Sequence, residues 1–202
     1  MTVVDLTMPM DERTPVFPGD PPFATADVGT LAVEGWRTRQ LSFGSHFGTH
    51  CEAPAHMIDH GETLDDFPID RFIGHAVIFD VRGQAKISNP SLDGLRLGDM
   101  AFFCTGQTDR AHEESFFKAH PVLTLGLAER LVAAGATVVG IDSFTVDDAP
   151  FAVHKFLLSH GILIVENLVN LGSLSGKRFH CTVLPLKLGR ADGAPCRVVA
   201  EC

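Results

Sequence analysis

The sequence His46-Phe-Gly-Thr-His50-Cys-Glu52-Ala-Pro-Ala-His56 places three of the chain's ten histidines and one carboxylate within a single short stretch. Imidazole and carboxylate groups are the ligands that zinc and similar divalent ions take in proteins. The stretch contains no leucine or valine, so it is a poor candidate for an element of the hydrophobic core. The pattern indicates a site of chemistry, although a histidine-rich surface loop would have the same composition.

The ligand-type residues of this stretch fall on alternate positions, which in a strand would put their side chains on one face. In a straight strand, however, His46 and His50 would stand about 13 Å apart at about 3.3 Å per residue. Metal bonds of about 2 Å require the side chains to converge, so the chain must bend, and Gly48 is the residue best able to permit the bend. Because Pro54 also excludes a regular central strand, we expect a strand that ends near Gly44 and then a tight irregular loop.

Composition and charge narrow the class of protein. The chain has 202 residues, of which 45% are hydrophobic and 20% charged, values typical of one globular domain spanning 1–202. The formal charge of −9 argues against nucleic-acid binding, since phosphates attract clustered lysine and arginine. No apolar run reaches about 18 residues, so we expect no membrane-spanning helix.

Two further features indicate a cytoplasmic protein. The first residues, MTVVDLTMPMDERT, carry an early acid and no basic segment, so we expect no signal peptide. The five cysteines are an odd, scattered set without a C-x-x-C pair, which is typical of reduced thiols.

The hydrophobic pattern predicts a mixed α and β (α+β) chain in which strands outnumber helices. A period of 3.6 residues and a closing Gly135 indicate a helix near 124–135, and Pro150 and Gly161 bound a second helix over 150–159. Short apolar or alternating runs predict the strands. We expect strands at 1–7, 36–43, 76–81, 99–106, 137–141, 162–167, 182–187 and 196–200.

A second set of ligand-type residues lies far down the chain. His154 falls inside the predicted helix 150–159, and Glu166 ends the apolar strand 162–167. A carboxylate at the end of a buried strand is costly without a cation or partner. Taken alone, Glu166 suits a salt-bridged strand end and His154 a surface helix position. Together with the first cluster they could complete a metal site, which usually draws its ligands from distant segments.

The motif H-x-G-T-H-x-[DE]-x-P-x-H at 46–56 resembles the hallmark of the metal-dependent cyclase family, which includes bacterial kynurenine formamidases and isatin hydrolases. The resemblance covers nearly the whole chain in the right order. Its further motifs are the turn Phe17-Pro-Gly-Asp20, the segment Gly140-Ile-Asp-Ser143 with Asp147, the pair His154 and Glu166 in I-V-E-N-L, and the tail Pro185-Leu-Lys187 with Asp192-Gly-x-Pro195-x-Arg197. From sequence alone, the turn at 17–20 would otherwise be a connector.

The resemblance implies a kynurenine formamidase-like swivelling β/β/α fold and a homodimer or higher homo-oligomer. It implies that His46, His50, Glu52, His154 and Glu166 bind one or two divalent ions, and that His56 transfers protons. Zinc suits the histidine-rich set best, while manganese tolerates many carboxylates. Asp142, if it lies close, would orient a metal ligand, whereas His60 beside Gly61 is expected to be a loop residue and not a ligand.

The resemblance further implies a metal-dependent hydrolase of a small amide, formamide or lactam, with arylformamidase as the lead activity and a metal-activated water as the nucleophile. Two alternatives stay open: a metal-dependent lyase or dehydratase acting on a small organic acid, and a metal-binding protein with little catalysis. The second is motivated by Glu52, where the family usually has aspartate. A nucleophilic Cys51 is a weaker idea, because alternation points its side chain away from the ligand face.

Overall fold

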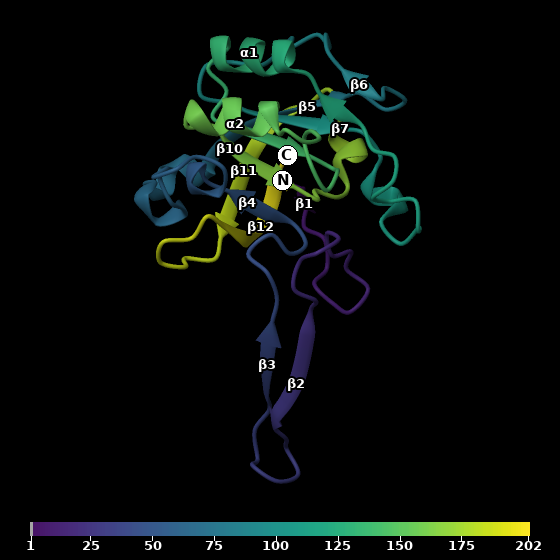
Figure 1. Ribbon diagram of the computed structural model, residues 1–202, viewed down its shortest axis with the longest axis vertical. Helices are drawn as coiled ribbons and strands as arrows, with labels where there is room; N and C mark the ends of the chain where they lie inside the picture. The colour runs from purple at the N-terminus through teal and green to yellow at the C-terminus, as the bar shows by residue number, and fades with distance from the viewer. Residues whose placement is uncertain (1) are drawn as a thin grey trace.

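The main sheet of the protein closes on itself. The computed structural model describes residues 2–202, and eight strands follow the order β1-β12-β11-β5-β7-β9-β10-β4, with an additional pairing between β12 and β4 (Figure 1). That pairing turns the sheet into a barrel-like ring and leaves β1 on its outside. The strands are β1 Val3–Asp5, β4 His50–Glu52, β5 Ile73–Asp80, β7 Met100–Cys104, β9 Val138–Ile141, β10 Leu163–Glu166, β11 Arg178–Pro185 and β12 Gly193–Glu201.

Alternating side chains of the central strands fill two separate cores. On β5, Ala76 and Ile78 belong to the core inside the ring, which also holds Cys181 and Val198 of the opposite strands. Val77, the intervening residue, belongs to a second core that includes the apolar residues of the two helices. Because both faces of these strands are buried, their sequences are continuous apolar runs and show no alternation.

The two helices cover one outer face of the ring. Helix α1 is Leu125–Ala133, and its Thr124 side chain accepts a hydrogen bond from the Leu127 amide at the N-terminus. Helix α2 is Ala152–Ser159, and both helices lie on the same side of the sheet (Figure 1). Their buried leucines pack against the outward-facing residues of the central strands, and this arrangement fixes where α2 presents His154.

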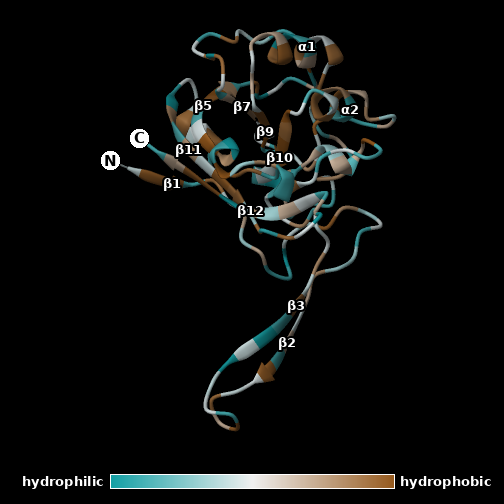
Figure 2. Ribbon diagram, turned by 90° about the vertical axis from the view of Figure 1, so that its left-hand side faces the viewer, coloured by the Kyte–Doolittle hydropathy of each residue, from teal (hydrophilic) through white to brown (hydrophobic). Residues whose placement is uncertain are grey.

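A two-stranded ribbon stands away from this body. Strands β2 Ala24–Gly29 and β3 Thr38–Ser42 pair antiparallel with each other, and both views show the ribbon extending beyond the ring (Figures 1 and 2). We call residues 24–42 the arm. Figure 2 shows hydrophobic residues on it, among them exposed Val28, Leu31, Val33, Trp36 and Leu41.

The expected mixed α and β class is confirmed, and every strand and helix predicted from the pattern has a counterpart. The expectation of an irregular loop throughout 45–56 is wrong for three residues, because His50–Glu52 forms strand β4 and pairs on both sides. The pattern also missed β2 and two short parallel strands, β6 Lys86–Ile87 and β8 Val122–Leu123. Short 3₁₀ turns occupy Pro54–His56, Leu64–Asp66, Ile69–Phe72, Thr108–Arg110 and Leu171–Leu174.

Within residues 2–202, no helix has the length and apolar character that crossing a bilayer requires.

Candidate metal centre

Strands β4 and β10 place three ligand-type side chains on one outer face of the ring. The strands pair antiparallel, with Glu166 opposite His50 and Ile164 opposite Glu52. Side chains two residues apart on β4 share a face, so His50 and Glu52 point the same way. Cys51 between them points into the core inside the ring, as the alternation predicted.

Gly48 makes the bend that the spacing required. Its φ of +63° is in the left-handed region that favours glycine. The Gly48 carbonyl accepts hydrogen bonds from His50 Nδ1 at 2.9 Å and from Asn167 Nδ2 at 3.1 Å. The bend lets His46 turn back, so that its Nδ1 lies 3.2 Å from Glu52 Oε1.

Helix α2 brings His154 to the same point from above the sheet. Its Nε2 lies 3.2 Å from Glu166 Oε1 and 3.6 Å from Glu52 Oε2. The ring is buried, and its Nδ1 donates to Asp147, whose other oxygen accepts from the Val153 amide at 2.6 Å. Asp147 therefore holds both the start of the helix and the histidine that the helix presents.

Glu52 lies at the centre of the cluster. Its Oε1 is 3.4 Å from His50 Nε2 and 3.9 Å from His56 Nε2, in addition to the contact with His46. His50 Nε2 lies 3.6 Å from Glu166 Oε2 as well. All six residues expected at the site thus come within a few ångströms of one another. They belong to segments more than a hundred positions apart in sequence.

Each of three histidines has one ring nitrogen fixed by an oxygen acceptor that lies away from the cluster. Nδ1 of His50 donates to the Gly48 carbonyl, Nδ1 of His154 donates to Asp147, and Nε2 of His46 donates to Asp192 Oδ2 at 2.8 Å. The second nitrogen of each ring therefore faces the carboxylate of Glu52. Metal-binding histidines are oriented by outer oxygen acceptors in this way.

The cluster holds two buried carboxylates, Glu52 and Glu166, side by side. Burial raises the pKa of Glu166, and the nearby charge of Glu52 raises it further. Burial acts in the same direction on Glu52, but the charge of His154 and hydrogen bonds from His46 and His50 outweigh it and hold its pKa well below the usual value. Two carboxylates this close repel each other, and a divalent cation would neutralise them.

The donor set fits a metal ion. Glu52 Oε2 is buried and has no hydrogen-bond partner, an arrangement that is costly for a carboxylate oxygen unless a cation binds it. Ligand atoms converge in two groups that share Glu52, namely His46, Glu52 and His56, and His50, Glu52 and Glu166. Mixed imidazole and carboxylate ligands are those of zinc, manganese and related ions.

His56 differs from the other histidines of the cluster. It belongs to the turn Pro54–His56, is only partly buried, and lies farther from Glu52 than His46 or His50 does. Burial lowers its pKa below the usual 6.5, and the positive charge of His46 adds to this against the opposing charge of Glu52. A neutral imidazole at neutral pH can accept a proton.

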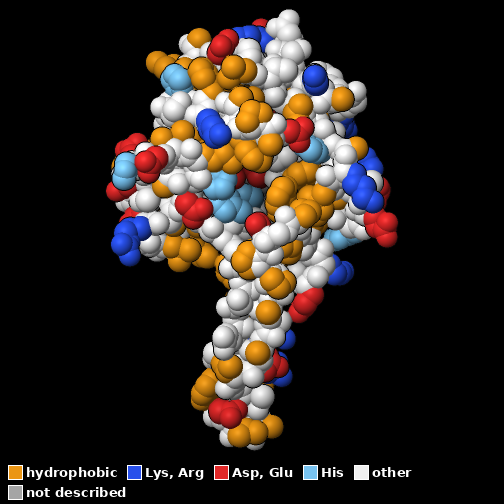
Figure 3. Space-filling view, viewed as in Figure 1, with side chains coloured by type: hydrophobic (Ala, Val, Ile, Leu, Met, Phe, Trp, Pro, Cys, Tyr) orange, Lys and Arg blue, Asp and Glu red, His pale blue; other side chains and the backbone are white. Residues whose placement is uncertain are grey.

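The cluster forms the floor of a cavity of about 280 Å³. Figure 3 shows its histidine side chains in a hollow at the centre of one face, with hydrophobic side chains beside them. The apolar part of the lining is aromatic, and the rings of Phe117 and Phe144 contact each other at 4.8 Å between centroids. The aromatic lining residues are Phe17, Phe117, Phe144 and Phe151.

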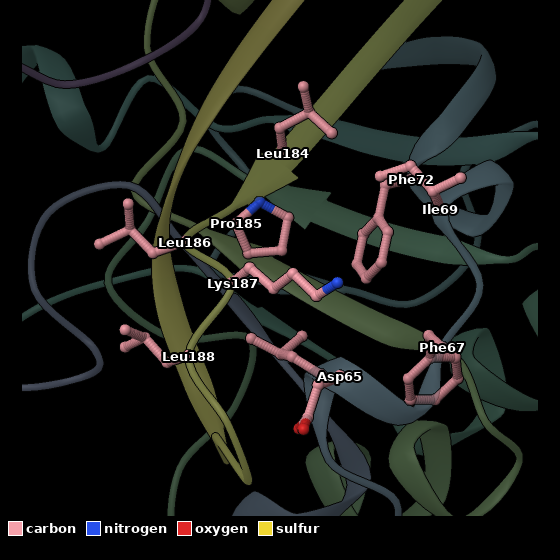
Figure 4. Close-up of a pocket in the computed structure, with 10 residues that line it drawn as sticks. Asp65, Phe67, Ile69, Phe72, Leu184, Pro185, Leu186, Lys187 and Leu188 are labelled. Atoms are coloured by element: carbon pink, nitrogen blue, oxygen red, sulfur yellow. The ribbon is translucent and has the colours of Figure 1, made fainter.

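A second cavity of about 150 Å³ lies between the end of β11 and the turns near residue 69. Figure 4 shows Leu184, Leu186 and Leu188 on one side of it and Ile69 and Phe72 on the other. Its only charged lining residues are Asp65 and Lys187. Among residues 2–202, the groups of converging metal-ligand atoms lie at the first cavity and not at this one.

Several expectations about surrounding residues need correction. Asp142 does not orient a ligand, because its carboxylate accepts hydrogen bonds from Thr105 and Gly106 instead. The turn at 17–20 is more than a connector, since Phe17 and Asp20 line the cavity. His60 is an exposed loop residue, as expected.

Sequence reasoning assigned no role to Asp147 or Asp192, which hold His154 and His46. The only signal for either was its place in a motif shared with the family.

Comparison with solved structures defines the class of fold. The chain superposes on isatin hydrolase A from Ralstonia solanacearum with a TM-score of 0.88 at 23% identity, covering 98% of this chain and 91% of that one. It superposes on a potential metal-dependent hydrolase with cyclase activity with a TM-score of 0.81 at 26% identity, covering 98% and 96%. These likenesses confirm the expected kynurenine formamidase-like fold.

Sequence comparison then identifies the family. The Cyclase family model matches residues 4–148, and the chain belongs to that family. It is 30% identical over 200 residues to a kynurenine formamidase from Bacillus cereus, covering 97% of this chain and 95% of the relative.

Proposed function

We propose that this protein is a metal-dependent hydrolase of a small amide, formamide or lactam, with an arylformamidase-like reaction as its lead activity. The observation that carries the proposal is the convergence of His46, His50, His154 and Glu166 on the carboxylate of Glu52. One oxygen of that carboxylate, Oε2, is buried without a hydrogen-bond partner. The similarity to kynurenine formamidase over nearly the whole chain supports the choice of C–N bond hydrolysis.

His46, His50, Glu52, His154 and Glu166 would hold one or two ions, with Glu52 placed to serve both. The two converging groups of ligand atoms share that residue and no other. Zinc suits the imidazoles, and manganese suits the carboxylates. When bound, such an ion polarises a carbonyl oxygen and lowers the pKa of water to about 7.

His56 would move the proton during the reaction. Its partly exposed ring lines the cavity beside the ligand cluster, and its lowered pKa keeps it neutral and able to take a proton from water. The same nitrogen can return that proton to the departing amine. His56 can therefore act as base and then as acid without leaving its position in the turn Pro54–His56.

The aromatic residues that line the cavity would bind the apolar part of the substrate. Phe17 and Phe117 meet edge to face at 6.0 Å between ring centroids, and Phe117 continues the contact to Phe144. A flat apolar group of about one ring fits a cavity of about 280 Å³.

The arm supports a homodimer or higher homo-oligomer. A two-stranded ribbon alone is marginally stable in water, and the arm exposes 59% of Leu31 and 81% of Val33. A second copy of the chain offers an exposed apolar surface at Leu184, Leu186 and Leu188 beside the second cavity (Figure 4). Burial of the arm against that copy would remove both surfaces from water.

We further propose that residues 1–202 act as one domain in the cytoplasm. Four of the five cysteines are buried and all five are free, which suits a reducing compartment.

Two single variants test the division of roles. His50→Ala should abolish metal binding, because it removes a buried imidazole that faces both carboxylates. His56→Ala should retain the metal and lose at least about a hundredfold in kcat, the usual contribution of a positioned acid–base group. The assay follows hydrolysis of an aryl formamide, with isatin as a lactam substrate, and metal content is measured by elemental analysis. Unchanged turnover in His56→Ala would overturn its role.

A further inference from the structure

One carboxylate at the edge of the site contacts both a ligand-type histidine and the proposed proton carrier. Asp192 Oδ2 accepts a hydrogen bond from His46 Nε2 at 2.8 Å and lies 3.6 Å from His56 Nδ1. The two rings are adjacent, with centroids 4.1 Å apart. Among residues 2–202, Asp192 is thus the only acid in contact with His46 Nε2 and His56 Nδ1, the nitrogens of the two rings that face away from Glu52.

The backbone places this carboxylate with little freedom. The Asp192 carbonyl accepts the Ala53 amide at 2.8 Å, and the next residue, Gly193, pairs with Glu52 across β12 and β4. A Cβ added at Gly193 would stand 2.8 Å from Cε1 of His46, closer than atoms can pack. The glycine therefore lets the chain run against the imidazole, so that Asp192 reaches its nitrogen.

The loop that carries Asp192 is also held by contacts that lie away from the histidines. Asp65 Oδ1 accepts the Arg190 amide at 2.8 Å, and the Leu64 amide donates to the Ala191 carbonyl at 2.9 Å. Asp65 therefore fixes the position of the loop without contact with the metal cluster, which makes it a matched control for Asp192.

We infer that Asp192 is a positioning residue that couples the two halves of the site: it orients His46 toward the metal and keeps the proton of His56 on Nδ1. The inference rests on the proposed function. A carboxylate is charged at neutral pH, so at 3.6 Å it favours the tautomer of His56 that carries a proton on the facing nitrogen. Nε2 of His56, which faces Glu52, is then free to take the proton of the reaction.

The charge and the hydrogen bond of Asp192 can be separated by substitution. Asp192→Asn keeps an oxygen that accepts from His46 but removes the charge that acts on His56. Asp192→Ala removes both. Because Asp192 does not line the substrate cavity, neither change should alter KM by more than about twofold, and the loss should fall on kcat and on metal affinity.

The experiment measures Co²⁺ affinity and visible spectrum, together with kcat and KM on an aryl formamide at saturating Co²⁺, for the full chain and three variants. Asp192→Ala should bind Co²⁺ about 10- to 100-fold more weakly, the usual effect of removing an outer partner of a metal ligand, with an altered spectrum. Asp192→Asn should bind more tightly than Asp192→Ala yet lose about tenfold or more in kcat. Asp65→Asn should match the wild type in every measurement.

Wild-type Co²⁺ affinity and kcat in both Asp192 variants would overturn the inference, while the proposed function would stand. Wild-type kcat in Asp192→Asn would overturn the role toward His56. Failure of the wild-type protein to bind Co²⁺ would instead contradict the proposed function. If Asp192→Ala does not fold, the comparison of Asp192→Asn with Asp65→Asn decides the same question, because asparagine preserves the shape of the side chain.

Discussion

At the scale of single residues, Glu52 is the common neighbour of the histidines in the cluster. Its carboxylate is within 4 Å of His46, His50, His56 and His154 at once. The histidines around Glu52 are therefore placed for a glutamate side chain. An aspartate carboxylate would lie more than about 1 Å farther from them, whereas a functional site tolerates displacements of about 0.5 Å.

Glu52→Asp should accordingly weaken metal binding by about tenfold or more. The estimate follows from the loss of one well-placed ligand contact. Calorimetric titration with Zn²⁺ measures the affinity, and Glu12→Asp, an exposed position far from the cluster in sequence, is the matched control. Tighter binding by Glu52→Asp would show that the site is not built around glutamate.

Asp142 gives a prediction about pH, since burial raises its pKa from 3.8 to about 6 despite the bonds from Thr105 and Gly106. The folded protein therefore holds this proton more tightly than the unfolded chain does. The resulting stabilisation is complete below about pH 4 and is lost as the pH rises to about 6, by about 3 kcal/mol.

Asp142→Asn does not titrate, so its unfolding free energy should lack this slope between pH 4 and 6. Urea unfolding of both proteins across that range measures the difference. Parallel pH dependences for the wild type and the variant would contradict the assignment.

The sequence predicted the site residues whose side chains are typical metal ligands. It did not predict the acids that hold those ligands by hydrogen bonds. His46, His50 and His56 stood out because histidines rarely gather in one stretch. Asp147 and Asp192 are ordinary acids in loops, and a loop aspartate has no spacing that reveals which ring it contacts. Asp142 was misplaced for the same reason, because only tertiary structure decides where a carboxylate at a strand end turns.

At the scale of elements, burial on both faces made most strands predictable from sequence. Strands β5, β7, β9 and β10 lie between the two cores, and a continuous apolar run is what such a position requires. Strand β4 was missed because its only core-facing residue is Cys51. Its two outward residues serve the site, so the usual hydrophobic signal is absent.

Gly140 shows how closely β9 is packed. A Cβ at this position would stand 2.4 Å from a ring carbon of Phe102 and 2.8 Å from Leu168. Gly140→Ala should therefore reduce the unfolding free energy by about 1–3 kcal/mol through overpacking.

Gly126→Ala is the matched control, because nothing lies within 4 Å of its added Cβ. It lies in α1 and should change stability by about 0.5 kcal/mol or less, in the stabilising direction. Thermal and denaturant unfolding measure both variants. Equal stability of Gly140→Ala and Gly126→Ala would mean that the strand can relax around the extra methyl group.

At the scale of the whole molecule, the sequence pattern could not predict that the main sheet closes into a ring or that residues 24–42 form an arm. Closure depends on β4 pairing with both β10 and β12, which are pairings over long separations. The predicted strand at 36–43 has a counterpart in β3, but no local signal tells an arm from a strand of the main sheet. Only the lack of buried residues on β3 distinguishes it, and burial is a property of the fold.

The arm makes a prediction about assembly. Leu31→Ser with Val33→Ser should shift the protein toward monomer at micromolar concentration, because both side chains are exposed at the tip of the arm. Leu97→Ser is the control, since Leu97 is 86% exposed beside Gly135 at the end of α1, on the opposite side of the body from the arm (Figure 1). Analytical ultracentrifugation measures the mass, and equal dimer fractions in the two variants would exclude the arm as the interface.

Hydrolysis by this protein should depend on a divalent ion bound by the cluster around Glu52. The most direct measurement is a titration of chelator-treated protein with Zn²⁺ or Mn²⁺, in which bound metal and aryl formamide hydrolysis are followed together. Activity should be lost on chelation and should return in proportion to one or two bound ions per chain. Full activity after chelation, or no metal bound under any loading condition, would contradict this dependence.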